Sequence, residues 1–107
     1  MENQKPRRAR SRWLVDAPEY VIDVFDNKKT ADRYSVFFGD APADDGHVLY
    51  LGLGDTPDMP NGFSQWASMP KRTFSDFRYR EGRHRIRWLD LPENVRAHVI
   101  RRATCED

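Results

Sequence analysis

The segment that decides the fold is residues 20–38, which have the sequence YVIDVFDNKKTADRYSVFF. Apolar and polar residues alternate over 20–25 and again over 33–38, a period typical of strands. The Asp, Asn and Lys residues of 26–30 are typical of a turn. The pattern predicts an antiparallel hairpin. In its first strand Tyr20, Ile22 and Val24 share one face and Asp23 lies on the other. In its second strand Tyr34, Val36 and Phe38 share one face and Ser35 and Phe37 lie opposite.

Further strands are expected after this hairpin. The run 47–51 is more continuously apolar than the first two strands, which predicts a central position in the sheet. Residues 72–80 alternate imperfectly and are rich in charge, so we expect a fourth, edge-like strand there. Residues 85–88 predict a last short strand, and residues 65–69 predict one helical turn before Pro70.

The C-terminal part has the clearest helix signal. Asp90 stands three residues before Glu93, the spacing of a capping box, and Pro92 suits the first turn of a helix. The residues that then share one helix face are Leu91, Val95, Val99 and Arg102. The sequence therefore predicts a small α+β domain, an antiparallel sheet of four or five strands with a C-terminal helix packed on it.

Length and composition limit the class of protein. The chain has 107 residues, 38% of them hydrophobic, which is enough for one small core. Residues 1–12 are basic without apolar periodicity, which predicts a disordered arm before a single domain at 13–107. No apolar run approaches the roughly 18 residues of a membrane span, and no secretory signal is expected. Cys105 is the one cysteine, so an internal disulfide is excluded and we expect a cytoplasmic protein.

The net charge of +1 hides an uneven distribution along the chain. Acidic residues dominate 14–70, whereas basic residues dominate 1–13 and 71–102. Two interpretations remain open. The acidic and basic halves neutralise each other across the domain, or they form a bipolar surface whose basic side meets nucleic acid or an acidic protein patch.

Residues that carry chemistry are sparse. Asp44, Asp45 and His47 lie close together but lack the spacing of a calcium loop. The three histidines fall in separate predicted elements, so none has a local partner for acid–base catalysis. Gly52 and Gly54 follow a strand without the third glycine and helix of a dinucleotide site. We therefore expect no catalytic residue, no metal and no cofactor.

The most distinctive stretch is residues 50–66, with the sequence YLGLGDTPDMPNGFSQW. Its prolines stiffen the loop and its glycines permit sharp reversals. Aromatic and thioether side chains beside amides are typical of the energetic centres of protein interfaces. The candidate binding residues are Asp55, Met59, Asn61, Phe63, Gln65 and Trp66. The alternative is that Phe63 and Trp66 turn inward and cap the core.

A second set of motifs supports a resemblance. Asp26-Asn27, Lys29-Thr30, Asp32-Arg33-Tyr34, Tyr50-Leu51-Gly52, Gly62-Phe63 and Asp90-Leu91-Pro92 occur in this order. In this combination the chain resembles a group of small uncharacterised proteins carried by bacteriophages and plasmids. Members of the group have His after the glutamine, where this chain has Trp66. The resemblance implies a mobile-element setting and no established activity.

These observations predict a non-enzymatic protein that binds a host protein through the 55–66 loop, with Arg33 and its turn beside it. Inhibition of a host defence complex is one form of this hypothesis. An acidic face would then occupy a phosphate-binding groove, and its residues are Asp40, Asp44, Asp45, Asp55 and Asp58. Within the turn, Asp26 or Asp32 is expected to pair with Arg33 and hold the hairpin together.

Two alternatives belong to other classes. The first is a protein that binds single-stranded nucleic acid, because arginines and aromatic residues interleave in the last forty residues. Its candidate contacts are Arg78, Arg80, Arg85 and Arg87. The second is a small hydrolase that uses His47 with the neighbouring aspartates.

Overall fold

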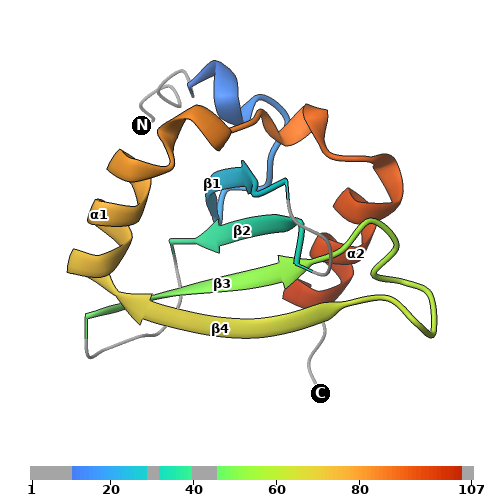
Figure 1. Ribbon diagram of the computed structural model, residues 1–107. Helices are drawn as coiled ribbons and strands as arrows, with labels where there is room; N and C mark the ends of the chain where they lie inside the picture. The colour runs from blue at the N-terminus through green and yellow to red at the C-terminus, as the bar shows by residue number, and fades with distance from the viewer. Residues whose placement is uncertain (1–10, 29–31, 40–45, 105–107) are drawn as a thin grey trace, which may run out of the picture.

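A computed structural model describes residues 11–28, 32–39 and 46–104. Four strands form one antiparallel sheet in the order β1-β2-β3-β4, so each strand pairs with its neighbour in sequence (Figure 1). The strands are β1 (Val21–Asp26), β2 (Tyr34–Phe38), β3 (His47–Leu53) and β4 (Ser64–Pro70). The predicted β1–β2 hairpin and the interior position of β3 are confirmed.

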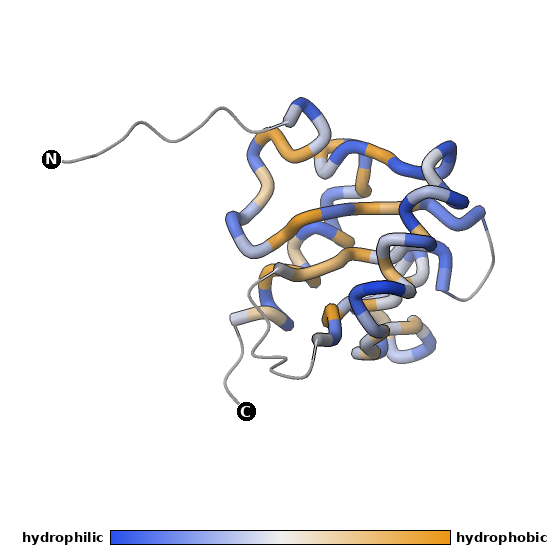
Figure 2. Tube along the Cα trace, turned by 90° about the vertical axis from the view of Figure 1, so that its left-hand side faces the viewer, coloured by the Kyte–Doolittle hydropathy of each residue, from blue (hydrophilic) through white to orange (hydrophobic). Residues whose placement is uncertain are grey.

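Two α-helices cover the two faces of the sheet. They are α1 (Lys71–Arg80) and α2 (Glu93–Thr104). The described residues also form three short 3-10 helices: η1 (Arg12–Leu14), η2 (Gly82–His84) and η3 (Trp88–Asp90). The prediction of a small α+β fold with an antiparallel sheet and a C-terminal helix is confirmed. Hydrophobic segments run along the strands, and hydrophilic stretches lie on the outside of the molecule (Figure 2).

The larger core lies between the sheet and α2, on what we call the α2 face. Alternation along β2 sends Tyr34, Val36 and Phe38 to this side, as predicted. In β1 the predicted common face is wrong at Ile22, which packs on the opposite side from Val24, because the register shifts between Val21 and Asp23. The buried members of the predicted stripe are Val95 and Val99 in α2 and Leu91, two residues before the helix begins. Arg102 ends the stripe with its guanidinium group over the ring of Trp66. The apolar stripe therefore packs the C-terminal helix onto the sheet.

The smaller core is aromatic and lies on the opposite side, the α1 face. Phe37 is fully buried at its centre, with ring centroids at 4.5 Å from Phe74 and 4.8 Å from Tyr50. Phe77 adds a second ring from α1, 5.5 Å from Phe37. Phe25 of β1 completes the cluster. Aromatic stacking thus holds α1 over part of this face.

The predicted edge strand at 72–80 is wrong, because these residues form α1. Phe74 and Phe77 are three residues apart, a spacing that places both rings on one side of a helix. In a strand the two rings would point to opposite faces. Packing of both rings on the α1 face therefore favours the helix. Pro70 is the last residue of β4 and the N-cap of α1.

The predicted helical turn at 65–69 is also wrong, because this segment lies within β4. Its pairing with β3 sets Trp66 opposite Leu51 and Met69 opposite Val48. Trp66 faces α2 and Met69 faces α1. Two residues three apart can serve opposite faces only in an extended chain.

The last predicted strand, 85–88, is wrong as well. Arg85 makes only an isolated bridge to Phe25, and the Ile86 N–H donates to the carbonyl of Val24 at 3.0 Å. Trp88 already begins η3. Two residues therefore cover the edge of β1 without extending the sheet.

The capping box at the last helix differs from the prediction. The Asp90 carboxylate accepts a hydrogen bond from the Arg87 backbone N–H at 2.9 Å, so it caps η3 and not α2. Helix α2 instead begins at Glu93, and the Pro92 carbonyl accepts hydrogen bonds from Val95 and Arg96. The predicted capping box is therefore wrong, because Asp90 belongs to η3 and Glu93 begins α2.

Some predictions fall outside the described residues. They concern the basic arm up to residue 10, Asp40, Asp44, Asp45 and Cys105. Among the helices that the structure describes, none is both long and apolar enough to cross a bilayer.

Candidate functional site

The loop that joins β3 to β4, residues 54–63, has a defined conformation. The Gly54 N–H donates to the Phe63 carbonyl at 3.0 Å, which closes the base of the loop. Within the loop, Met59 N–H donates to the Thr56 carbonyl at 3.1 Å and Gly62 N–H to the Met59 carbonyl at 2.8 Å. Two successive turns therefore fold the loop back on itself.

Glycine at position 62 is required by this conformation. A Cβ atom there would overlap the carbonyl oxygen of Thr56 and lie 2.9 Å from the Cα of Pro57. Both atoms belong to the backbone, so they cannot turn aside as a side chain could. The loop thus packs backbone against backbone, which only glycine permits.

Side chains from distant segments hold the loop from outside. The Asn94 amide of α2 donates to the Asp55 carbonyl at 3.1 Å and to the Asp58 carboxylate at 3.4 Å. The Arg33 guanidinium group reaches the Asp55 carboxylate at 3.2 Å. The loop is therefore fixed to both α2 and the β1–β2 turn.

Arg33 also makes the predicted pair within its own hairpin. Its Nε and Nη2 atoms donate to the two carboxylate oxygens of Asp26, each at 3.1 Å. Burial favours a raised pKa for Asp26, but the bonds from Arg33 and from the Lys28 N–H outweigh it, so the pKa is lowered. The Asp26 bond likewise raises the pKa of Arg33. This two-point contact joins the hairpin to the 54–63 loop through one arginine.

The predicted binding residues divide between two sides of the molecule. Met59 is 55% exposed, and Asn61 and Gln65 are also exposed. Phe63 is half-buried. Its ring lies over Gly52 on the α1 face, 3.6 Å from where a Cβ atom of residue 52 would stand. Trp66 is half-buried on the α2 face, 5.2 Å from the ring of Phe38. The two aromatic residues therefore do not form one surface.

The arginines of the nucleic-acid alternative all take part in ion pairs. Arg78 and Arg85 each approach Asp23 at 2.8 Å, and Asp23 is only 1% exposed. Arg80 pairs with Asp76 at 3.3 Å. Arg87 pairs with Asp90 at 2.8 Å. Charges of the basic half thus neutralise carboxylates in both halves of the chain.

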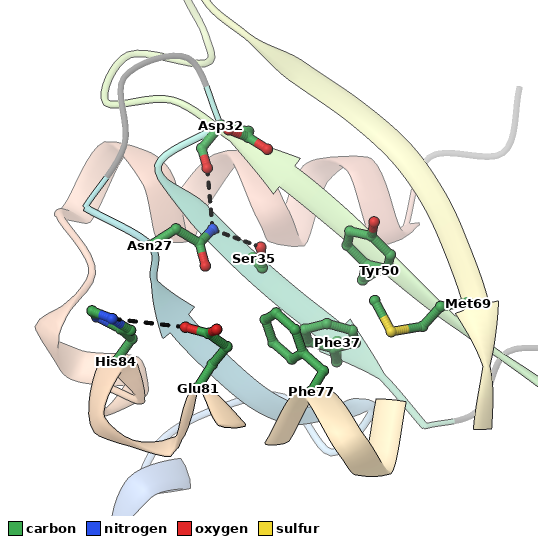
Figure 3. A pocket seen from close by; sticks show the side chains of 9 residues that line it. All are labelled: Asn27, Asp32, Ser35, Phe37, Tyr50, Met69, Phe77, Glu81 and His84. Carbon is green, nitrogen blue, oxygen red and sulfur yellow. Dashed lines mark hydrogen bonds and ion pairs between the residues drawn. The ribbon is translucent and has the colours of Figure 1, made fainter. Parts of the chain in front are cut away.

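Sequence reasoning missed a groove of about 420 Å³ on the α1 face (Figure 3). Its apolar surface comes from Phe37, Tyr50, Met69 and Phe77. Its polar wall comes from Asn27, Asp32, Ser35, Glu81 and His84. The lining residues come from the β1–β2 turn, from β2, β3 and β4, and from the end of α1, so the groove forms only when these segments fold together. No local sequence pattern signals it.

The polar wall of the groove is organised by one amide. Asn27 Nδ2 donates to the Asp32 carbonyl at 3.1 Å and to Ser35 Oγ at 2.9 Å. Since a carbonyl oxygen only accepts, the nitrogen must face it, and the Asn27 Oδ1 acceptor is left for other donors. Asp32 and Glu81 lie on either side of this amide (Figure 3). The wall is therefore rich in hydrogen-bond acceptors.

Histidines and acidic residues give no cluster that could hold a metal ion in the described parts of the chain. His47 begins β3, away from this groove, and the aspartates proposed to act with it lie at 40–45, outside the described residues. His98 of α2 is buried, with Nε2 at 2.9 Å from Ser64 Oγ. Burial and the nearby Arg101 and Arg102 lower its pKa.

Comparison with known proteins found no match to a family model, to a curated protein or to a solved structure.

Proposed function

We propose that this chain is a non-enzymatic binding protein whose 54–63 loop docks onto another protein. The docking surface consists of Asp55, Met59, Asn61, Phe63 and Gln65. Arg33 supports this surface through its hydrogen bond to the Asp55 carboxylate. Trp66 supports it by anchoring β4 in the larger core.

The observation that carries the proposal is a rigid loop with an exposed thioether at its tip. Three backbone hydrogen bonds and the contacts of Asn94 and Arg33 fix the loop, while Met59 stays 55% exposed. A loop held in its bound conformation loses less entropy on association than a flexible one. Methionine adapts its shape to a partner surface. The loop therefore combines a fixed frame with an adaptable contact.

The resemblance to proteins of phages and plasmids suggests a bacterial host protein as the partner, met in the cytoplasm. Inhibition of a defence complex stays within this proposal. The nucleic-acid alternative is less favoured, because each of its four arginines already lies against a carboxylate.

The test is affinity capture from a bacterial lysate with the Met59→Glu variant beside the original chain. A protein partner should be captured equally with and without nuclease and should be lost with Met59→Glu, because a charge would be buried in the interface. Tyr79→Ala is the matched control, since Tyr79 is 88% exposed on α1. Capture that disappears with nuclease or falls steeply with salt would instead support nucleic acid.

Gly62→Ala tests whether the loop conformation matters. The added methyl group overlaps backbone atoms of the loop, so we expect both a loss of capture and a destabilisation of about 1–3 kcal/mol. Gly82→Ala serves as the control, because a Cβ at Gly82 meets no atom within 4 Å. If the Gly62→Ala protein captures the partner as well as the original chain does, the loop is not part of the binding surface.

A further inference from the structure

We infer that the groove on the α1 face binds an arginine side chain of the partner protein. The inference rests on the proposed function, because the arginine belongs to the same partner that the 54–63 loop contacts. It names a second contact point and the chemistry that this point recognises.

The apolar surface of the groove suits the flat guanidinium group and its aliphatic stem. Tyr50 and Phe77 are partly exposed in the groove, and the buried ring of Phe37 packs against both, at 4.8 Å from Tyr50 and 5.5 Å from Phe77. Met69 lies beside the rings (Figure 3). Aromatic faces attract cations, and arginine also stacks on them through its plane.

The polar wall offers acceptors where the guanidinium N–H groups would arrive. In the part of the chain that the structure describes, the Asp32 carboxylate has no ion-pair partner. Glu81 pairs at 3.5 Å with Arg80 and at 3.7 Å with His84, longer distances than the 2.8 Å pairs of Asp23. Asn27 adds a neutral acceptor between the two carboxylates. These acceptors match a guanidinium group, which donates hydrogen bonds and accepts none.

The groove is also continuous with the loop surface. A Cβ at Gly52 would lie 3.6 Å from Phe63 and 3.7 Å from the Cβ of Asp32, so these two side chains flank the same glycine. Phe63 belongs to the proposed docking surface, and Asp32 lines the groove. A partner on the loop therefore lies within reach of the groove.

The test titrates the isotopically labelled chain with acetyl-Gly-Arg-Gly-amide and follows backbone amide resonances. We expect saturable shifts at groove residues such as Ser35 and Tyr50. The citrulline analogue has the same shape without the charge, and it should bind about tenfold more weakly. A lysine analogue should also bind more weakly, because an ammonium group does not stack.

Variants of the wall locate the site. Asp32→Asn and Glu81→Gln should each weaken the arginine peptide by about three- to tenfold. Glu93→Gln removes an exposed carboxylate from α2, on the other side of the sheet, and should have no effect. Equal binding of the arginine and citrulline peptides, or equal effects of all three variants, would overturn the inference.

This titration needs no partner protein, so its result is separate from the capture experiment. If the arginine peptide binds but no partner is captured, the assignment of the groove stands and the proposal that the 54–63 loop docks onto a protein is refuted. Capture lost with Met59→Glu but no arginine binding would do the reverse.

Discussion

Arg33 joins three parts of the molecule through one side chain. It donates two hydrogen bonds to Asp26 and one to Asp55, so it links the β1–β2 hairpin to the 54–63 loop. Asp26 is 6% exposed, and Arg33 at 3.1 Å is a closer cationic partner than the ammonium group of Lys28 at 3.9 Å. The residue therefore influences both the stability of the hairpin and the position of the proposed docking loop.

Arg33→Ala should lower the free energy of unfolding by about 2 kcal/mol at neutral pH, because it leaves a largely buried carboxylate without its partner. Arg33→Lys should lose less, since it keeps the charge without the two-point geometry. The contribution of Asp26 is present above its ordinary pKa of 3.8 and is lost as pH falls through the lowered pKa. Urea unfolding should therefore show the two proteins converging at acidic pH. A constant difference at every pH would refute this role.

His98 gives a second pH dependence of defined sign. Its pKa lies below the ordinary 6.5, since burial and the neighbouring arginines disfavour the charged ring. Below pH 6.5 the unfolded chain takes up a proton before the folded chain does, so the stability from His98 declines as pH falls. Unfolding at a series of pH values should show a smaller decline for His98→Gln than for the original chain. Parallel curves would show that His98 does not titrate in this way.

Among the elements, α1 depends on a buried charge as well as on its aromatic rings. Asp23 of β1 sits between Arg78 of α1 and Arg85 of the segment that follows η2. Burial raises the pKa of the Asp23 carboxyl, while the two guanidinium groups act in the opposite direction. The three residues therefore attach α1 and residues 85–86 to the β1 edge of the sheet.

Asp23→Asn should destabilise the domain by about 1–3 kcal/mol, because the amide replaces one of the two buried oxygens that face Arg78 and Arg85 with an N–H donor. Asp76→Asn is the matched control, since Asp76 makes an exposed pair with Arg80 and should change stability by less than about 0.5 kcal/mol. Urea unfolding measures both. Similar values for the two variants would mean that Asp23 holds α1 no better than a surface pair.

At the scale of the whole molecule, the two faces of the sheet differ in how completely they are covered. The α2 face is packed with aliphatic and aromatic side chains and closes the larger core. The α1 face is covered by α1 only in part, and the groove opens where the helix leaves it. The acidic first part of the chain and the basic last part meet at the β1 edge of the sheet, where Arg78 and Arg85 pair with Asp23. One face therefore supplies stability, and the other leaves a recess beside the loop.

Local pattern was sufficient for the elements that bury side chains at a regular interval. The alternation in 20–25 and 33–38, the apolar run at 47–51 and the stripe through Val95 and Val99 each correspond to an element of the structure. Their burial depends on the spacing of neighbouring residues, which any sequence displays directly. The Asp26–Arg33 pair belongs here too, because a turn brings its members together.

Contacts between distant segments decided the remainder. Residues 71–80 form a helix because this places Phe74 and Phe77 on one side, in contact with the α1-face cluster. Residues 64–70 form a strand because they pair with β3. The groove arises only when the β1–β2 turn, three strands and the end of α1 come together. Phe63 and Trp66 separated for the same reason. Positions far apart along the chain acquire a common environment only through folding, and no local period records which of them will meet.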